Sequence, residues 1–255
     1  NGILDLVVAE ADSASVGVLL GNGDGTFAAE RTYPLPAPPF TLSVADFNGD
    51  GHRDILSGVP GGTTFGPVIL LPGNGAGQFG EPVYRGDVEY FRGIGTFWMA
   101  SSDLDGDGDQ DIVVVDLGGL DVGVWSYLNN GDGTFKRIQY VYDGYFVPAL
   151  SVALGDVNED SCTDVVFTTV NTFNVIYPGN CDGTFQKEQG VRIYGNGNSG
   201  FGLTLGDVNG DNHLDIVTSG VVLGWDPIYG QEAGHLLSVM LGLSLIHISE
   251  PTRPY

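Results

Sequence analysis

The sequence is poor in basic residues and in long hydrophobic runs, and each shortage excludes a class of protein. Only 9 Lys and Arg residues stand against 32 Asp and Glu residues, which gives a formal net charge of -23. Binding to nucleic acid phosphates needs clustered Lys and Arg, so a nucleic acid partner is not expected. No uninterrupted run of about 18 apolar residues is present, so the sequence predicts no membrane-spanning helix.

The sequence also lacks the motifs of common enzymes and any sustained helical periodicity. It contains no Gly-x-Ser-x-Gly nucleophile turn, no His-Glu-x-x-His zinc motif and no glycine-rich phosphate loop. Apolar residues do not recur at the spacing of an amphipathic helix over any long stretch. Instead, 41 glycines separate short apolar runs. We therefore expect an all-β protein that is not an enzyme.

An aspartate-rich motif of nine residues is the main feature that is present. Its clearest copy runs from Asp103 to Asp111 and leads directly into the β-branched run 112–115. Oxygen-bearing side chains at positions 1, 3, 5 and 9, with a backbone carbonyl at position 7, suit calcium, which prefers several hard oxygen ligands. The motif recurs at 46–54, 156–164 and 207–215, and residues 1–5 match its second half. A generally acidic surface would explain the charge but not this spacing.

Two motifs repeat with the same period. The ninth-position aspartates are separated by 49, 57, 53 and 51 residues, and a Gly-Asn-Gly-Asp-Gly-Thr-Phe type of turn starts at 21, 73, 129 and 179. A period of about 50 residues indicates an array of similar units. Each unit reads as four short strands bounded by glycine turns, which is typical of a β-propeller blade. We interpret the second motif as a tight β-turn rather than a metal site.

The predicted units are approximately 1–38, 39–92, 93–147, 148–199 and 200–242. Because the sequence begins inside an aspartate loop, we expect it to be a fragment of a longer protein. Residues 243–255 resemble the translation of a sequencing adapter, and we exclude them from the fold and the function.

The five copies in phase resemble the FG-GAP and VCBS repeats of integrin-α-like β-propellers. Phe201-Gly202 before the last aspartate loop, and the segment 57–60 after the first complete one, resemble the opening and closing segments of such a repeat. The resemblance implies a propeller of seven four-stranded blades, of which about four to five are present. It also implies structural calcium, a secreted or cell-surface location, and a partner bound on the face opposite the calcium loops.

The resemblance implies calcium ligands in each of the four complete loops. Backbone carbonyls would come from His52, Asp109, Cys162 and His213. The side-chain ligands would be Asp46, Asn48, Asp50 and Asp54; Asp103, Asp105, Asp107 and Asp111; Asp156, Asn158, Asp160 and Asp164; and Asp207, Asn209, Asp211 and Asp215. Position 6 favours glycine, and Ser161 makes the third site the most doubtful.

Three functional hypotheses remain open at this stage. The first is an adhesion module that binds protein or carbohydrate, the second is the non-catalytic propeller of a larger secreted enzyme such as a lyase or phospholipase, and the third is a lectin. Exposed aromatic residues suit either kind of ligand. The candidates on the face opposite the calcium loops are Tyr90, Phe91, Tyr145, Phe146, Trp225 and Tyr229. The two cysteines, Cys162 and Cys181, could form a disulfide within one repeat or remain free thiols.

Overall fold

The computed structural model describes residues 2–59, 68–85, 96–116, 123–143, 149–169, 173–187, 191–194, 198–226 and 230–241. Within these ranges the chain forms strands β1 to β18 and no α-helix. No described helix could therefore cross a membrane. The all-β prediction is confirmed.

The strands form five antiparallel sheets, and within each sheet neighbouring strands are consecutive in the sequence. Three sheets have four strands, and the first and last have three. The first two sheets contain β1 (Leu6–Glu10), β2 (Ser15–Leu19) and β3 (Arg31–Pro34), then β4 (Thr41–Ala45), β5 (Asp54–Gly58), β6 (Val68–Leu71) and β7 (Val83–Arg85). The third contains β8 (Thr96–Ser102), β9 (Asp111–Asp116), β10 (Gly123–Asn129) and β11 (Phe135–Asp143). The last two contain β12 (Ala149–Gly155), β13 (Asp164–Thr169), β14 (Phe173–Tyr177) and β15 (Val191–Tyr194), then β16 (Asn198–Gly206), β17 (Asp215–Asp226) and β18 (Gly230–Met240).

The ninth-position aspartate marks the second strand of each unit. Asp54, Asp111, Asp164 and Asp215 are the first residues of β5, β9, β13 and β17. Asp5 directly precedes β1, so β1 corresponds to the second strand of the other sheets. The first sheet therefore contains a second, third and fourth strand, and the last sheet contains a first, second and third.

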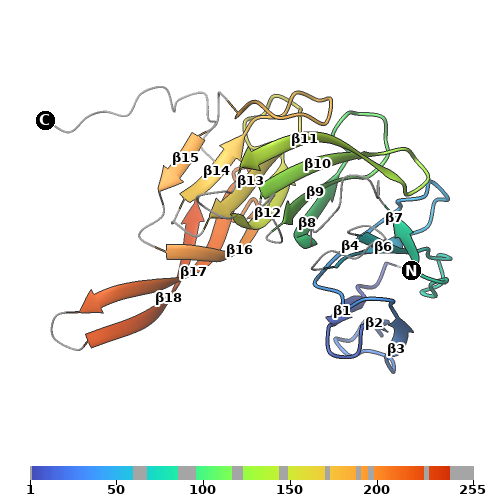
Figure 1. Ribbon diagram of the computed structural model, residues 1–255. Coiled ribbons are helices and arrows are strands. Elements are labelled where there is room, and N and C mark those ends of the chain that lie inside the picture. Colours follow the sequence, from blue (N-terminus) through green and yellow to red (C-terminus); the bar gives the residue numbers. More distant parts are fainter. Residues whose placement is uncertain are drawn as a thin grey trace, which may run out of the picture.

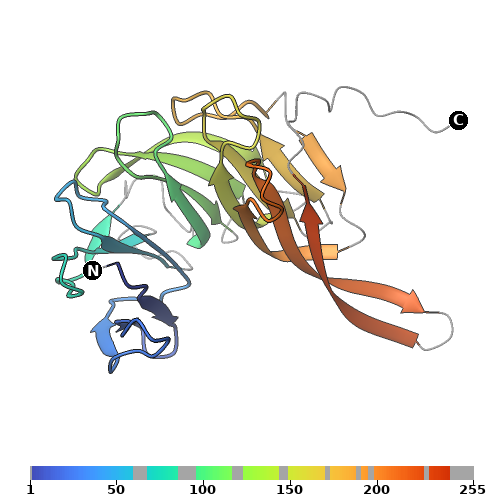
Figure 2. The ribbon, with the colours of Figure 1, turned by 180° about the vertical axis from the view of Figure 1, so that it is seen from behind.

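The sheets follow one another in chain order. The first strands β4, β8, β12 and β16 contact one another in sequence, and β1 contacts β4. The sheet β1–β3 lies at one end of the array and the sheet β16–β18 at the other (Figures 1 and 2). Sheets that are joined in this order through their first strands have the arrangement of consecutive propeller blades.

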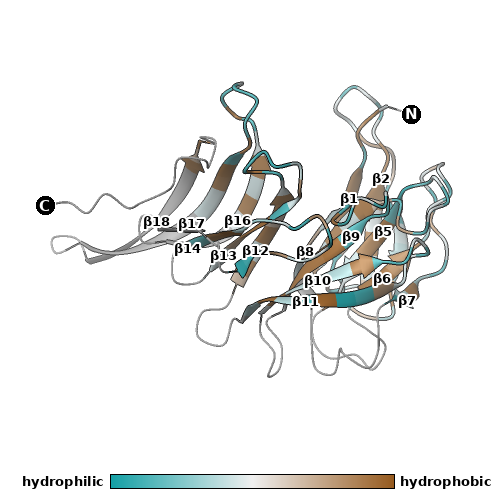
Figure 3. Cartoon of the chain, turned by 90° about the horizontal axis from the view of Figure 1, so that it is seen from above, coloured by the Kyte–Doolittle hydropathy of each residue, from teal (hydrophilic) through white to brown (hydrophobic). Residues whose placement is uncertain are grey.

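The hydrophobic core lies between neighbouring sheets. Ile112 and Val114 belong to the cluster shared with the second sheet, whereas Val113 and Val115 belong to the cluster shared with the fourth. Successive residues of a strand point to opposite faces, so a strand between two sheets must be apolar on both. This explains the uninterrupted run from 112 to 115 in the sequence. Figure 3 shows hydrophobic residues along β5, β6 and β9 and hydrophilic residues along the loops.

Candidate metal centre

The ninth aspartate of the second complete loop is a buried clamp. The side chain of Asp111 is 0% exposed. Its Oδ2 accepts the backbone N–H of Leu104 at 2.8 Å, and its Oδ1 accepts that of Asn129 at 2.8 Å. The carboxylate thus ties the start of the loop to the turn that follows the third strand. The equivalent donors are Phe47 and Gly73 for Asp54, Val157 and Gly179 for Asp164, and Val208 for Asp215.

The other acidic side chains of this loop accept backbone N–H groups from within the loop. Asp103 accepts from Gly106 at 2.7 Å and from Gly108 at 3.1 Å. Asp105 accepts from Asp107 at 3.2 Å, and Asp107 accepts from Asp109 at 2.9 Å. These short-range hydrogen bonds wind the backbone around the carboxylates. The first-position residues Asp46, Asp156 and Asp207 make equivalent bonds in their loops.

Three carboxylates converge in this loop. Asp103, Asp105 and Asp111 each offer an oxygen, and the three oxygens lie within 4.8 Å of one another. This is the one such group of acidic, histidine or cysteine side chains among the described residues. Asp107, which the sequence also predicts as a ligand, lies outside the group. Three hard oxygen donors on one short loop fit the ligand preference of calcium. The other loops have an amide oxygen at position 3, from Asn48, Asn158 and Asn209.

Burial makes the carboxylates of Asp111 and Asp164 costly to ionise. Burial raises the pKa of Asp111 to about 6, against the opposing effect of its two backbone hydrogen bonds, and the nearby Asp105 and Asp107 raise it further. The pKa of Asp164 is also raised to about 6, chiefly by burial. A cation among these carboxylates would favour their charged form and offset this cost.

The loops need a left-handed backbone at positions 4 and 6. Glycine supplies it in the first two complete loops, as at Gly108 with φ 94°. In the third loop the same conformation falls on Glu159 with φ 65° and on Ser161 with φ 71°. A residue other than glycine in this left-handed conformation destabilises the folded state by about 1 to 2 kcal/mol. The third loop is therefore strained, in line with the doubt that its sequence raises.

We expect Ser161→Gly to raise the free energy of unfolding by about 0.5 to 1 kcal/mol. Relief of the left-handed strain stabilises the folded state by more than the added flexibility of glycine stabilises the unfolded chain. Gly108→Ala is the matched reverse change, because an added Cβ would meet nothing within 4 Å at that position. It should destabilise by about 1 kcal/mol. Urea unfolding curves measure both, and equal stability of the three proteins would contradict the prediction.

The Asn-Gly-Asp-Gly turns are held by hydrogen bonds of their own. Asp132 Oδ1 accepts the backbone N–H and the hydroxyl of Thr134, at 2.9 and 2.5 Å. Asp24 and Asp182 make the same pair of bonds to Thr26 and Thr184. The hydrogen bond from the threonine hydroxyl, followed by the bond from its backbone N–H, lowers the pKa of Asp24 and of Asp132. The side chains are engaged in turn structure, as we infer from the sequence.

Asn129 joins two neighbouring units, which the sequence analysis missed. Its side-chain amide donates to the Phe47 carbonyl at 2.8 Å, in the aspartate loop of the preceding sheet. Its Oδ1 accepts the backbone N–H groups of Gly131 and Gly133, both at 3.1 Å. This turn starts with asparagine where the other three start with glycine, but nothing in the turn motif indicates a partner in another sheet. In the third and fourth loops, an ion pair between Glu159 and His213 provides a further link.

The structure describes the two predicted cysteines but not the side chains of the six predicted aromatic residues. Cys162 and Cys181 form a disulfide, with their Cα atoms 4.9 Å apart. It connects the third aspartate loop to the turn of the same sheet. Trp225 lies in β17, but its side chain falls outside the described part. Tyr90, Phe91, Tyr145, Phe146 and Tyr229 lie outside the described residues altogether.

Comparisons with known proteins agree with the repeat pattern. The FG-GAP-like repeat family model matches residues 1–57, 103–167 and 156–218, and the FG-GAP repeat model matches 39–79. Integrin alpha-PS2 of Drosophila melanogaster is 33% identical over 144 residues, which cover 49% of this chain and 10% of the integrin. This chain therefore spans about a tenth of the length of that relative.

Among solved structures, the crystal structure of BBS1N in complex with ARL6DN, soaked with lead, is similar. The TM-score is 0.42 at 13% sequence identity, over 86% of this chain and 71% of that chain. The assignment to a family comes from the repeat matches, which cover more than half of the sequence. The chain belongs to the FG-GAP-like repeat family, whose repeats form β-propeller blades.

Proposed function

We propose that this chain is a calcium-stabilised adhesion module of an extracellular or cell-surface protein, without catalytic activity of its own. In this proposal, calcium binds the aspartate loops, and a protein or carbohydrate partner binds the opposite face of the array. The observation that carries the metal part is the convergence of Asp103, Asp105 and Asp111 within 4.8 Å. The similarity to an integrin α-chain supports the adhesion part.

The role of calcium would be structural. A bound cation would supply positive charge among carboxylates that otherwise repel one another. The residues themselves already connect the loop to β9 and to the turn after β10 through the Asp111 clamp. Each loop supplies its own ligands, so little coordination is left for a substrate. Stabilisation of sheet packing therefore explains the loops better than metal-assisted chemistry does.

Removing calcium is expected to lower the melting temperature of the chain by several degrees. When the free calcium concentration is 100 times the dissociation constant of a site, binding there adds about 2.7 kcal/mol to the free energy of unfolding. For a chain of this size that corresponds to roughly 5 to 10 °C. Circular dichroism melts in calcium, in magnesium and after chelation give the comparison. The same melting temperature in all three would contradict calcium binding, and full protection by magnesium would contradict calcium selectivity.

The partner part of the proposal needs a separate test. The six aromatic residues predicted for the opposite face are the first to change, in the pairs Tyr90 with Phe91, Tyr145 with Phe146, and Trp225 with Tyr229. Glycan arrays and binding to extracellular matrix proteins, measured with the parent and with each paired alanine variant, identify the ligand class. A ligand that binds every variant as tightly as the parent would place the binding face elsewhere.

A further inference from the structure

The residue at position 7 of the aspartate loop touches the turn of its own sheet, at the third residue of the turn motif. A Cβ added at Gly75 would lie 2.6 Å from the ring of His52. One added at Gly131 would lie 2.7 Å from the carboxylate of Asp109. Glycine at the third turn position therefore leaves room for the side chain that arrives from the loop, in both the second and the third sheet.

In the fourth sheet, both sides of this contact are cysteine. Cys162 stands at position 7 of the third complete loop and Cys181 at the third position of the turn, and their disulfide replaces the contact with a covalent bond. Cys162 is partly buried and Cys181 is exposed, so a small thiol can reach the bond from solvent. The bridge is therefore a chemically reversible link between a predicted calcium loop and its turn.

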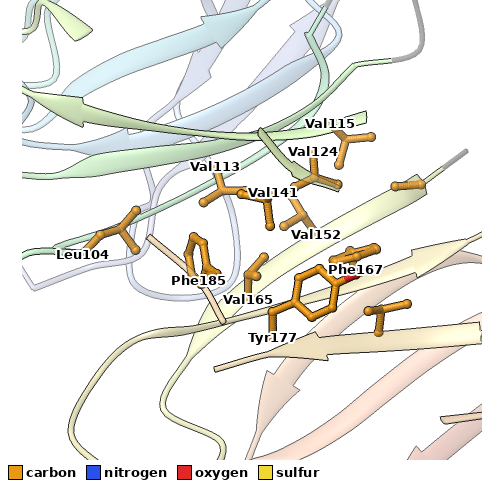
Figure 4. Packing of buried hydrophobic residues seen from close by; sticks show 12 residues of the cluster. Leu104, Val113, Val115, Val124, Val141, Val152, Val165, Phe167, Tyr177 and Phe185 are labelled. Atoms are coloured by element: carbon orange, nitrogen blue, oxygen red, sulfur yellow. The ribbon is translucent and has the colours of Figure 1, made fainter. Parts of the chain in front are cut away.

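The turn is the rigid side of this link. Asp182 Oδ1 accepts the backbone N–H and the hydroxyl of Thr184. The side-chain amide of Asn180 donates to the same hydroxyl oxygen at 2.9 Å. Phe185, which ends the turn, is 3% exposed and packs in one core cluster with Leu104 (Figure 4). The turn is thus held in place by interactions that do not involve the disulfide.

The loop is the weak side of the link. Glu159 and Ser161 hold φ values of 65° and 71°, in the left-handed region where the first two complete loops have glycine. Within the loop, the Oδ2 of Asp156 accepts the N–H of Ser161 at 2.8 Å. The Oδ1 of Asp160 accepts the N–H of Cys162 at 2.8 Å. Both bonds are exposed, so water competes for their donors and acceptors and they hold the loop only weakly.

We propose that the disulfide between Cys162 and Cys181 is a redox-controlled latch on the third calcium loop, and that a dithiol reductant which opens it weakens calcium binding there. The latch rests on the proposed calcium function and adds its regulation. With the latch closed, the carbonyl of Cys162 and the left-handed backbone at Ser161 are held in place before the metal arrives. With the latch open, calcium binding has to order the loop as well, and this entropic cost lowers the affinity.

Opening of the latch is a thiol–disulfide exchange. A thiolate of the dithiol attacks Sγ of the more exposed Cys181, a mixed disulfide forms, and Cys162 leaves as a thiolate. The second thiolate of the reductant then attacks the reductant's own sulfur in the mixed disulfide, so that Cys181 leaves and the reductant becomes a cyclic disulfide. The chain gains two electrons, and each cysteine thiolate takes up a proton from water. Closure is the reverse reaction with the oxidised dithiol.

Calcium titration of the oxidised and the reduced chain tests the latch. Isothermal titration calorimetry is carried out on the full chain before and after treatment with dithiothreitol, and on the double variant Cys162→Ser with Cys181→Ser. We expect one class of site to bind about tenfold more weakly in the reduced chain and in the double variant, within the usual range of coupling between sites. The other sites should keep their affinity. Asp160→Ala is the matched control, because it removes a predicted ligand of the third loop and keeps both cysteines, so its remaining sites should not respond to reduction.

Linkage supplies an independent readout. If closure of the disulfide strengthens calcium binding by some factor, calcium must protect the disulfide against reduction by the same factor. The equilibrium of the chain with reduced and oxidised dithiothreitol, followed by counting free thiols, should therefore shift about tenfold toward the disulfide in saturating calcium. The Asp160→Ala variant should show no such shift.

The outcomes separate the latch from the calcium proposal. Equal calcium affinity of the oxidised, reduced and serine-substituted chains, with an unshifted dithiothreitol equilibrium, would overturn the latch and leave the calcium proposal standing. Equal weakening of every site on reduction would also overturn a latch confined to the third loop. Absence of calcium binding by the oxidised chain would instead contradict the proposed calcium function, and the latch with it.

Discussion

Replacement of Asp111 by alanine is expected to lower the free energy of unfolding by about 3 to 5 kcal/mol, even without calcium. The change removes the acceptor of two buried backbone N–H groups, those of Leu104 and Asn129. An unsatisfied buried donor costs about 1 to 3 kcal/mol, and the two losses occur together. Urea unfolding in calcium-free buffer measures this effect, and repetition in calcium adds the loss of metal binding.

Asp107→Ala is the matched control within the same loop. Asp107 is exposed, and its Oδ1 accepts the N–H of its near neighbour Asp109. Without calcium this variant should lie within about 0.5 kcal/mol of the parent, as exposed substitutions usually do. In calcium, this variant should lose part of the stabilisation that the metal provides, because the loop then has one carboxylate fewer. Equal destabilisation by both alanine variants in calcium-free buffer would contradict the clamp role of Asp111.

The class of fold was predictable because its signals are local and repeated. The run from 112 to 115 is too short for a typical helix and is apolar at every position, which indicates a strand covered on both faces. The turn motifs fix where strands end, since they demand a left-handed backbone that glycine supplies. The register is also readable, because the ninth-position aspartate starts a second strand in four sheets. Repetition turned weak single signals into a consistent pattern.

The double role of the ninth aspartate was not predictable from spacing alone. The sequence presents Asp111 as one of four side-chain ligands, equivalent to Asp103. The structure separates them, because Asp111 is fully buried and reaches the turn at Asn129, beyond the third strand. That contact depends on how β9 and β10 pair, which a nine-residue motif does not contain. Asn129 itself was missed for the same reason, since its partner, Phe47, lies in another sheet.

The packing between sheets was not readable from the motif. Only the structure shows that Phe47 and Leu104, the second residues of their loops, are buried between neighbouring sheets.

Removing the disulfide between Cys162 and Cys181 is expected to lower the free energy of unfolding by about 3 kcal/mol. The bridge closes a loop with a sequence separation of 19 residues, and the chain-entropy argument gives this magnitude for a loop of such length. The double variant Cys162→Ser with Cys181→Ser avoids an odd thiol. Urea unfolding of this variant, compared with the oxidised and the chemically reduced parent, measures the contribution.

The bridge also acts where the backbone is strained, which makes a second outcome testable. Glu159, Ser161 and Cys181 all have positive φ values without being glycine. In the parent, the disulfide holds the loop and the turn together against this strain. Without it, the loop is free to leave the left-handed conformation, and the clamp of Asp164 to Gly179 should weaken as well. Adding Glu159→Gly and Ser161→Gly to the double serine variant should therefore recover about 1 kcal/mol. A loss below 1 kcal/mol on removal of the bridge, or no recovery by the glycines, would show that the strand pairing of β12 to β15 alone keeps the third loop in place.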